Sequence, residues 1–452
     1  MKRRVVITTG AKGLGVLGVS AVLAFGTTAD GGLTGSGGPG TQAQVPAHAQ
    51  VTAAISLRDV DGGPDYFKRI PGSLPTDPSY FPVGVWKESL TDPADAPKDR
   101  AVLLNTYVEL TGDSDVAFAA QVGSVALTEE PLPGAVGRVL SDEVDMWARG
   151  GNAEWTGSWP GVGEICRPVN MGCGFTVQRE LLKAIPPEAL VYSNYGKGVT
   201  FWEGDEHAAT FLNEFQHVVS ADNYWFTDPY ICGPSEGGAV LAAGQELAPE
   251  RCRLAANYGW TISRLRSLIK PAASKPVWAF VEVGHPFTDD QAPTITGPQI
   301  RAAVWSSLIH GARGVVYFNH SFGGTCQTQH ILRDACGNDV RPWVTAVNRQ
   351  ITGLAPVLNA PFLDGALVHG PGIDTAVKVH GDDLYVFAGS AQAGPQTAEL
   401  TLACLPGASV PATVLDEDRT VTVSNGVFRD TFDDGNAVHL YKIGGAARTC
   451  AP

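Results

Sequence analysis

Eight short apolar runs, each followed by polar residues, constrain the fold of this chain more than any other feature. Continuous apolar runs of this length are typical of strands that are buried on both faces, as in a parallel sheet. Eight such strands over about 240 residues are what a (β/α)8 barrel requires. The runs cover residues 81–86, 102–108, 124–128, 138–143, 189–194, 218–224, 276–282 and 314–319.

Helices are predicted between several of these strands. The clearest covers residues 296–310, where Thr296 and Gln299 have the spacing of a capping box and Gly311 supplies the C-terminal stop. One face of this helix carries Ile300, Ala303, Val304 and Leu308. The interval between the third and fourth strands is too short for a full helix. A last helix is predicted at 340–358.

Beyond this last helix, short runs follow in which apolar and polar residues alternate. Turn pairs such as Gly381-Asp382 and Asn425-Gly426 separate many of them, and this pattern indicates an antiparallel sandwich. The predicted strands are 366–368, 375–379, 384–388, 397–402, 412–415, 420–423, 427–432 and 437–443. The expected fold class is therefore α/β: a (β/α)8 TIM barrel followed by a C-terminal antiparallel β-sandwich domain.

The N-terminus has the three parts of a secretory signal peptide. A basic start at residues 1–4 is followed by an apolar run at 16–25 and by small residues at 26–29, with Ala29 as the cleavage point. The apolar run is short for a membrane span, and an uncleaved anchor is the alternative. Arg3-Arg4 permits a twin-arginine route. We therefore expect a secreted, extracellular protein.

Composition divides the rest of the chain. Residues 30–50 are rich in Gly, Thr, Gln and Pro and nearly uncharged, which is typical of a flexible linker. We expect the folded region to begin between Tyr66 and Tyr80. The predicted divisions are 1–29 for the signal peptide, 30–75 for the linker or N-terminal extension, 76–360 for the barrel and 361–447 for the sandwich.

The eight cysteines form neighbour pairs when they are taken in order, although eight cysteines allow 105 pairings. The neighbour pairs are Cys166 with Cys173, Cys232 with Cys252, Cys326 with Cys336, and Cys404 with Cys450. Export favours disulfides over metal binding, and neither a CxxC motif nor zinc spacing of Cys and His occurs. The first three pairs fall in the loops after strands four, six and eight.

The charge balance excludes one class of partner. There are 32 Lys and Arg against 46 Asp and Glu, for a net charge of −14, and there is no basic block beyond the first four residues. Such a chain is a poor candidate for holding phosphate backbones. We therefore expect no nucleic-acid partner, no membrane contact after signal cleavage, and a monomer.

Two strand ends carry the carboxylates that matter most. The fourth strand ends in Asp142-Glu143 and the seventh in Glu282. In a (β/α)8 barrel the active site lies at the carboxyl ends of the strands, so both Glu side chains are expected to face one cavity. Such a pair suits glycoside hydrolysis, in which one carboxyl protonates the leaving oxygen and the other attacks the anomeric carbon or activates water.

The segments 81–88, 105–110, 140–145, 279–284 and 302–319 resemble uncharacterised secreted members of clan GH-A, the large retaining superfamily of barrel glycoside hydrolases. The resemblance covers roughly residues 80–360. It implies that Glu143 is the acid/base and Glu282 the nucleophile, with no metal and no organic cofactor. One position departs from the superfamily, which usually has Asn before the acid/base, whereas this chain has Asp142.

Further residues near the strand ends are candidates for substrate binding. Tyr224 is placed to hydrogen-bond Glu282 and keep it ionised. Aromatic rings at a barrel mouth stack on sugars, but the same residues also fill cores, and Asn residues there also cap loops. The candidates are Asp142, Tyr224, Trp86, Asn105, Tyr107, Asn194, Trp225, Tyr317 and Asn319. Reserve carboxylates are Glu88, Glu109, Glu129 and Glu130.

These observations lead to a first hypothesis of a secreted retaining glycoside hydrolase that acts on an extracellular or cell-wall polysaccharide. The alternative, motivated by Asp142, is a non-catalytic carbohydrate-binding or cell-surface protein on a barrel scaffold. An esterase or peptidase is disfavoured because neither GxSxG nor HExxH occurs.

Overall fold

The computed structural model describes residues 54–289, 292–407 and 409–452. The predicted signal peptide and the predicted linker at 30–50 lie outside the described residues.

Eight parallel strands form the barrel, and all eight predicted strands are confirmed. They are β2 (Val83–Trp86), β3 (Thr106–Val108), β4 (Val125–Thr128), β5 (Gly137–Asp142), β8 (Leu190–Tyr195), β9 (Val218–Ala221), β10 (Ala279–Glu282) and β11 (Val315–Phe318). Their hydrogen-bonded order is β10-β11-β2-β3-β4-β5-β8-β9. A parallel bridge between Val219 and Val277 closes the ring between β9 and β10.

The strands are buried on both faces, as the continuous apolar runs predict. One set of side chains fills the barrel interior and includes Trp86, Leu127, Val139, Leu190, Tyr192, Val218, Trp278, Phe280 and Val316. The alternate positions pack outward in the main core cluster, which includes residues of the surrounding helices. The barrel is therefore a solid core with loops at each end.

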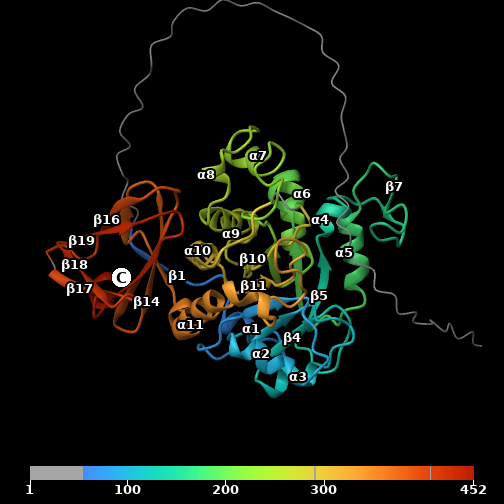
Figure 1. The fold of residues 1–452 in the computed structure, drawn as a ribbon, viewed down its shortest axis with the longest axis horizontal. Helices are drawn as coiled ribbons and strands as arrows, with labels where there is room; N and C mark the ends of the chain where they lie inside the picture. Colours follow the sequence, from blue (N-terminus) through green and yellow to red (C-terminus); the bar gives the residue numbers. More distant parts are fainter. Residues whose placement is uncertain (1–53, 290–291, 408) are drawn as a thin grey trace, which may run out of the picture. The chain divides into compact units, whose positions relative to one another are not determined.

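Helices follow most of the strands and surround them (Figure 1). The longer ones are α2 (Asp95–Ala101), α3 (Val116–Gln121), α5 (Gly174–Leu182), α6 (Asp205–Glu214), α9 (Ala256–Leu268), α10 (Gly297–Ile309) and α11 (Arg341–Leu358). The capping box of Thr296 and Gln299 is present at the start of α10, and Gly311 past its end has φ 101°. No helix lies between β4 and β5, as their short interval predicts.

The C-terminal part is a ten-stranded antiparallel sheet, and all eight strands predicted there are confirmed. The strands are β1 (Ser56–Arg58), β12 (Phe362–Asp364), β13 (Leu367–His369), β14 (Ile373–His380), β15 (Asp383–Ser390), β16 (Gln396–Leu402), β17 (Ser409–Val414), β18 (Arg419–Ser424), β19 (Val427–Phe432) and β20 (Val438–Ile443). Their order is β1-β12-β14-β15-β20-β17-β18-β19-β16-β13. Side chains from strands across this sheet share one apolar cluster, so the sheet folds over its own core as a sandwich.

Regular structure begins earlier than the expected start between Tyr66 and Tyr80. Strand β1 pairs antiparallel with β12, and Arg58 forms an ion pair with Asp364 across this edge. The helix α1 (Pro64–Phe67) follows it. A strand of three residues has too few positions for a periodic pattern, which is why the sequence did not reveal β1.

All four predicted disulfides are present: Cys166–Cys173, Cys232–Cys252, Cys326–Cys336 and Cys404–Cys450. The first three lie in the loops that follow β5, β9 and β11. Within the described part of the chain, no helix has the length and apolar character that crossing a bilayer requires.

Candidate active site at the carboxyl ends of the barrel strands

Three charged residues directly after barrel strands have left-handed backbone conformations. Lys87 follows β2 with φ 49°, Glu109 follows β3 with φ 56°, and Glu143 follows β5 with φ 48°. This conformation is unfavourable for residues other than glycine and is seen where the surrounding structure enforces it, often at functional sites. All three side chains belong to the end of the barrel where sequence reasoning places the site.

A bulge in β5 orients Asp142. The register of β5 against β8 shifts between Val139 and Ser141, so that Asp142 pairs with Asn194 instead of pointing to the helices. Ser141 accepts a hydrogen bond from Gln178 of α5, on the outer side of the barrel. Bulges commonly redirect a side chain next to a functional site.

Asn194 of β8 links side chains of the strands on either side of it, β5 and β9. Its Nδ2 donates to Asp142 Oδ1 at 2.9 Å, and its Oδ1 accepts from the hydroxyl of Ser220 in β9 at 2.6 Å. Asn194 also opposes the rise in the pKa of Asp222, which directly follows β9. Asn194 is fully buried, so it acts as a fixed support beneath the acidic side chains.

Asp222, which directly follows β9, lies close enough to Glu143 for its charge to act on that carboxyl. Burial and the charges of Asp222 and Asp145 raise the pKa of Glu143 well above its usual value, whereas Lys197 opposes this rise. Burial and the charges of Asp142 and Asp145 likewise raise the pKa of Asp222. Like charges that lie so close together disfavour simultaneous ionisation of these carboxyls. Both residues are only partly buried.

Asp142 adds a third acidic group to this pair. Burial, followed by the charges of Glu143 and Glu109, raises its pKa well above the usual value, and Asn194 and Lys87 oppose the rise. Lys87 Nζ lies 2.9 Å from Glu109 Oε1. The mouth therefore has a strongly acidic sector, with Lys87 beside Asp142 and Lys197 beside Glu143.

Tyr224 lies among these acids but does not have the partner predicted for it. Its hydroxyl donates to Asp222 Oδ2 at 3.3 Å, not to Glu282. Burial and the charges of Asp222, Glu143, Asp142 and Glu282 all raise its pKa, which shows that its ring lies within the field of all four carboxyls. The prediction of a Tyr224–Glu282 hydrogen bond is therefore wrong.

Tyr258 of α9 takes the place that was predicted for Tyr224. Its hydroxyl donates to Glu282 Oε2, while the backbone N–H of Phe226 donates to Oε1 at 3.1 Å. The hydroxyl of Thr227 also reaches Oε1, at 3.5 Å. Burial raises the pKa of Glu282 to about 7, and the hydrogen bonds from Tyr258, Phe226 and Thr227 lower it. Glu282 is fully buried, so both of its oxygens face the β9–α9 segment instead of open solvent.

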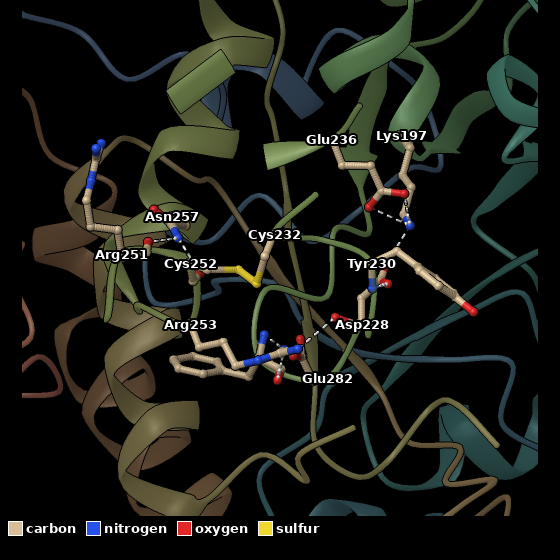
Figure 2. Close-up of a disulfide and its surroundings, with 11 residues drawn as sticks. Lys197, Asp228, Tyr230, Cys232, Glu236, Arg251, Cys252, Arg253, Asn257 and Glu282 are labelled. Carbon is tan, nitrogen blue, oxygen red and sulfur yellow. Dashed lines mark hydrogen bonds and ion pairs between the residues drawn. A yellow bond between two sulfur atoms is a disulfide. The ribbon is translucent and has the colours of Figure 1, made fainter. Parts of the chain in front are cut away.

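The Cys232–Cys252 disulfide organises the segment that covers Glu282 (Figure 2). Arg253, the residue after Cys252, donates to the carbonyl of Phe226 at 2.5 Å and to that of Asp228 at 3.2 Å. Its guanidinium lies close to Glu282, whose charge opposes the lowering of the Arg253 pKa by burial (Figure 2). The disulfide thus holds in place the turn that donates to Glu282.

Lys197 connects this segment to the loop after β8. Its Nζ lies 2.6 Å from Asp228 Oδ2 and 2.8 Å from Glu236 Oε2, as Figure 2 shows. Asp145 fixes the same loop by accepting from the N–H groups of Gly196 and Val199. Lys197 also lowers the pKa of Glu143, so one cation joins the surroundings of both predicted catalytic residues.

Four predicted substrate-binding residues have partners away from the mouth. Asn105 precedes β3 and caps the N–H of Val83, at the amino end of the barrel. Three aromatic side chains are buried, and their polar atoms donate to residues of the surrounding helices: Tyr107 to Asp99, Trp225 to Thr261 and Tyr317 to Asn348. Because these polar atoms are already bonded, we do not retain the four as substrate contacts.

Asn319 directly follows β11 and is buried. Its Nδ2 donates to Glu88, whereas its Oδ1 has no hydrogen-bond partner among the described residues, so Asn319 stays a candidate.

Trp86 occupies the barrel interior near the carboxyl ends, against Tyr192 and Phe280, and is 3% exposed. It is therefore part of the floor beneath the acidic sector. The reserve carboxylate Glu88 is a structural partner of Arg333 and His330. Of the predicted substrate-binding residues, Asp142, Asn194 and Tyr224 lie together at the mouth with Glu143.

Asp222, Tyr258 and Arg253 are the site residues that the sequence analysis missed. The sixth predicted strand extends to Tyr224 and so includes Asp222, whereas β9 ends at Ala221 and leaves Asp222 directly after the strand. An acidic residue directly after a predicted strand was a usable signal there. Tyr258 and Arg253 come from a long connecting segment, where no sequence pattern reports their proximity to Glu282.

No family model matches this chain, and no curated protein matches it. Solved structures with a similar fold include a GH30 endoxylanase from Clostridium papyrosolvens, with 10% identity, a TM-score of 0.43, and coverage of 86% of this chain and 98% of that one. A glycoside hydrolase family 5 protein from Bacteroides vulgatus has 12% identity, a TM-score of 0.45, and coverage of 82% and 93%. A maltogenic alpha-amylase from Thermotoga neapolitana has 8% identity, a TM-score of 0.45, and coverage of 81% and 99%.

At such identities and TM-scores, no activity can be transferred from these proteins to this chain. Fold alone does not determine function, so an activity has to be inferred from the side chains at the mouth of the barrel. Those side chains are the clustered carboxyls of Asp142, Glu143 and Asp222, and the buried Glu282 with its hydrogen bonds from Tyr258 and Phe226.

Proposed function

We propose that this chain is a secreted retaining glycoside hydrolase that cleaves O-glycosidic bonds of an extracellular or cell-wall polysaccharide. The observation that carries the proposal is the cluster of carboxyl groups at the open end of the barrel, where Glu143 directly follows β5, Asp142 is bound to Asn194 and Asp222 is bound to Tyr224. A glycosidase needs one carboxylic acid that keeps its proton near neutral pH, and the raised pKa of Glu143 suits it to this role. The four disulfides suit an oxidising, extracellular compartment.

In this proposal Glu143 is the acid/base and Glu282 the nucleophile. Glu143 gives its proton to the leaving oxygen while Glu282 attacks the anomeric carbon, so that the C–O bond breaks and a glycosyl-enzyme ester forms. Glu143, now ionised, then takes a proton from water, and the resulting nucleophile displaces Glu282 from the sugar. The hydrogen bonds from Tyr258 and Phe226 favour the ionised form of Glu282, which attack requires.

One observation favours a second candidate, a non-catalytic carbohydrate-binding protein. Glu282 is fully buried, and both of its oxygens accept hydrogen bonds from the β9–α9 segment. Attack on a sugar requires that one of these oxygens be released when the substrate binds. If the β9–α9 segment keeps both of its hydrogen bonds to Glu282 when a glycan binds, the acidic mouth can hold the glycan without cleaving it.

Release of reducing ends from a panel of plant and bacterial wall polysaccharides tests the proposal. Wild-type protein is expected to release them, and Glu143→Gln and Glu282→Gln are each expected to lose activity by about 100-fold or more. Glu130→Gln, which changes an exposed carboxylate after β4, serves as the matched control and is expected to behave like wild type. Binding without any release of reducing ends supports the second candidate, and near-full activity of either site variant refutes the assignment.

The two roles can be separated with azide once an activated substrate is known. Azide attacks the glycosyl-enzyme of Glu143→Ala and gives a product of retained configuration. In Glu282→Ala it replaces the missing nucleophile and gives the inverted product. The opposite pattern would exchange the two assignments.

A further inference from the structure

The exposed aromatic side chains of the described residues gather at one end of the barrel. Five aromatic residues are among the large hydrophobic residues that are at least 39% exposed: Trp159, Trp202, Tyr230, Phe322 and Trp343. Each lies after the carboxyl end of a barrel strand, in the segment that follows β5, β8, β9 or β11. Within the described residues, the C-terminal sheet has none of comparable exposure.

Among these exposed residues, Trp159 packs against two other Trp rings. It lies on the loop between the two strands of a small hairpin, β6 (Glu154–Trp155) and β7 (Cys166–Arg167), which is seen beside α4 and α5 in Figure 1. Its ring centroid is 5.3 Å from that of Trp147 and 5.7 Å from that of Trp155. The Cys166–Cys173 disulfide ties β7 to the start of α5. A platform that is rigid before binding loses little entropy when a ligand arrives.

The Trp cluster is joined directly to the acidic sector. Trp147 belongs to α4 (Val144–Trp147), the short helix that begins at Glu143, and its indole N–H donates to the carbonyl of Asp142 at 2.9 Å. The exposed ring of Trp159 is therefore connected to the backbone of Asp142 through one ring contact and one hydrogen bond.

A second aromatic cluster lies on the opposite side of the mouth. Phe322 packs against Phe318 at 6.2 Å, and Phe318 packs against Tyr224 at 5.3 Å. Strands β5 and β11 are four positions apart in a ring of eight, so the loops that follow them face each other across the barrel. Asp142 and Glu143 lie on the β5 side, and Asp222 and Tyr224 follow β9, which lies between β5 and β11 in the ring.

We propose that an extended glycan chain crosses the mouth from the Trp159 platform to the Phe322 cluster, so that the carboxylates meet it at an internal linkage. This inference rests on the proposed function for its ligand class and adds that the substrate is a polymer attacked within the chain. Flat amphipathic rings suit the apolar faces of sugars, whereas the net charge of −14 disfavours an anionic surface.

Binding of the full-length protein to insoluble cellulose, xylan, chitin and peptidoglycan tests the path without requiring turnover. Trp159→Ala and Phe322→Ala are each expected to weaken binding about fivefold to tenfold on the polymer that wild type binds. Val162→Ala, at a 74% exposed aliphatic residue of the same loop, and Leu57→Ala, on β1, are the matched controls and should bind like wild type.

Soluble oligosaccharides of the same polymer then test the crossing. The loss of affinity in Trp159→Ala and Phe322→Ala should be large for long oligosaccharides and small for disaccharides. An equal loss at all lengths, normal binding by both variants, or an equal loss in Val162→Ala overturns the inference. Binding that behaves as expected without any release of reducing ends supports the path and refutes only the proposed hydrolysis.

Discussion

Replacing Glu282 by Gln is expected to stabilise the protein at alkaline pH. Burial raises the pKa of this carboxyl from 4.5 to about 7. Between these two values the folded protein retains a proton that the unfolded chain has lost, so the free energy of unfolding falls as the pH rises through this window. At 1.36 kcal/mol for each pKa unit, the loss amounts to about 3 kcal/mol, and a neutral amide removes it.

The surroundings of Glu282 can accept the amide. Gln has the same shape as Glu, and its oxygen can keep the hydrogen bond from the N–H of Phe226. Its NH2 group would face the hydroxyl of Tyr258, which can rotate and accept instead of donating. The substitution therefore changes the charge while the packing is preserved.

Urea unfolding followed by tryptophan fluorescence at about pH 4.5 and about pH 8 measures the effect. Between these conditions wild type should lose about 3 kcal/mol more stability than Glu282→Gln. The partly buried acids Asp142, Glu143 and Asp222 titrate in both proteins, so their contributions cancel in the difference. Identical pH dependence in the two proteins would refute the claim that Glu282 bears a large cost of ionisation.

Three further predictions concern the groups around the two Glu residues. Asp222→Asn removes a charge that raises the pKa of Glu143, so the alkaline limb of the pH profile of kcat/KM should shift to lower pH; an unshifted limb contradicts the pairing. Tyr258→Phe removes a hydrogen bond that lowers the pKa of Glu282, so the acidic limb should shift to higher pH, and a shift to lower pH contradicts this. Replacing Cys232 and Cys252 by Ser should cost about 2–4 kcal/mol in unfolding measurements and reduce turnover, whereas the same change at Cys404 and Cys450 should reduce stability only; equal turnover in both double variants argues against a role in positioning Glu282.

The barrel could be predicted from the sequence because parallel strands buried on both faces leave a strong local signal. The run around Val83 is apolar throughout and the run around Leu190 is apolar as far as Tyr192, and each forms a fully buried strand. The spacing of Thr296 and Gln299 in a capping box predicts where α10 begins. The sandwich was equally readable, because alternation such as that of 396–402 reports which side chains face its core. Local patterns specify local elements, and the order of eight such elements then restricts the fold.

The site was less predictable because its contacts depend on geometry between segments. Tyr224 and Tyr258 are both tyrosines near Glu282 in the fold, and only the path of the β9–α9 segment determines which one donates to it. The bulge at Leu140 turns Asp142 inward, and the sequence pattern of 137–142 does not predict this bulge. The aromatic residues Tyr107, Trp225 and Tyr317 follow the same composition rule as mouth residues, yet their neighbours on the helices bind their polar atoms.

The first regular segment of the described chain, β1, pairs with β12, which lies some 300 residues later in the sequence. Synthesis from the N-terminus cannot complete this edge until nearly all of the barrel has been made. A fragment cut at residue 76 would lack the strand that shields β12 and would present bare backbone N–H and C=O groups to other chains. The short strand β1 thus covers the edge of β12 and protects it from pairing with other chains. We expect a protein without β1 to be less soluble than the full chain.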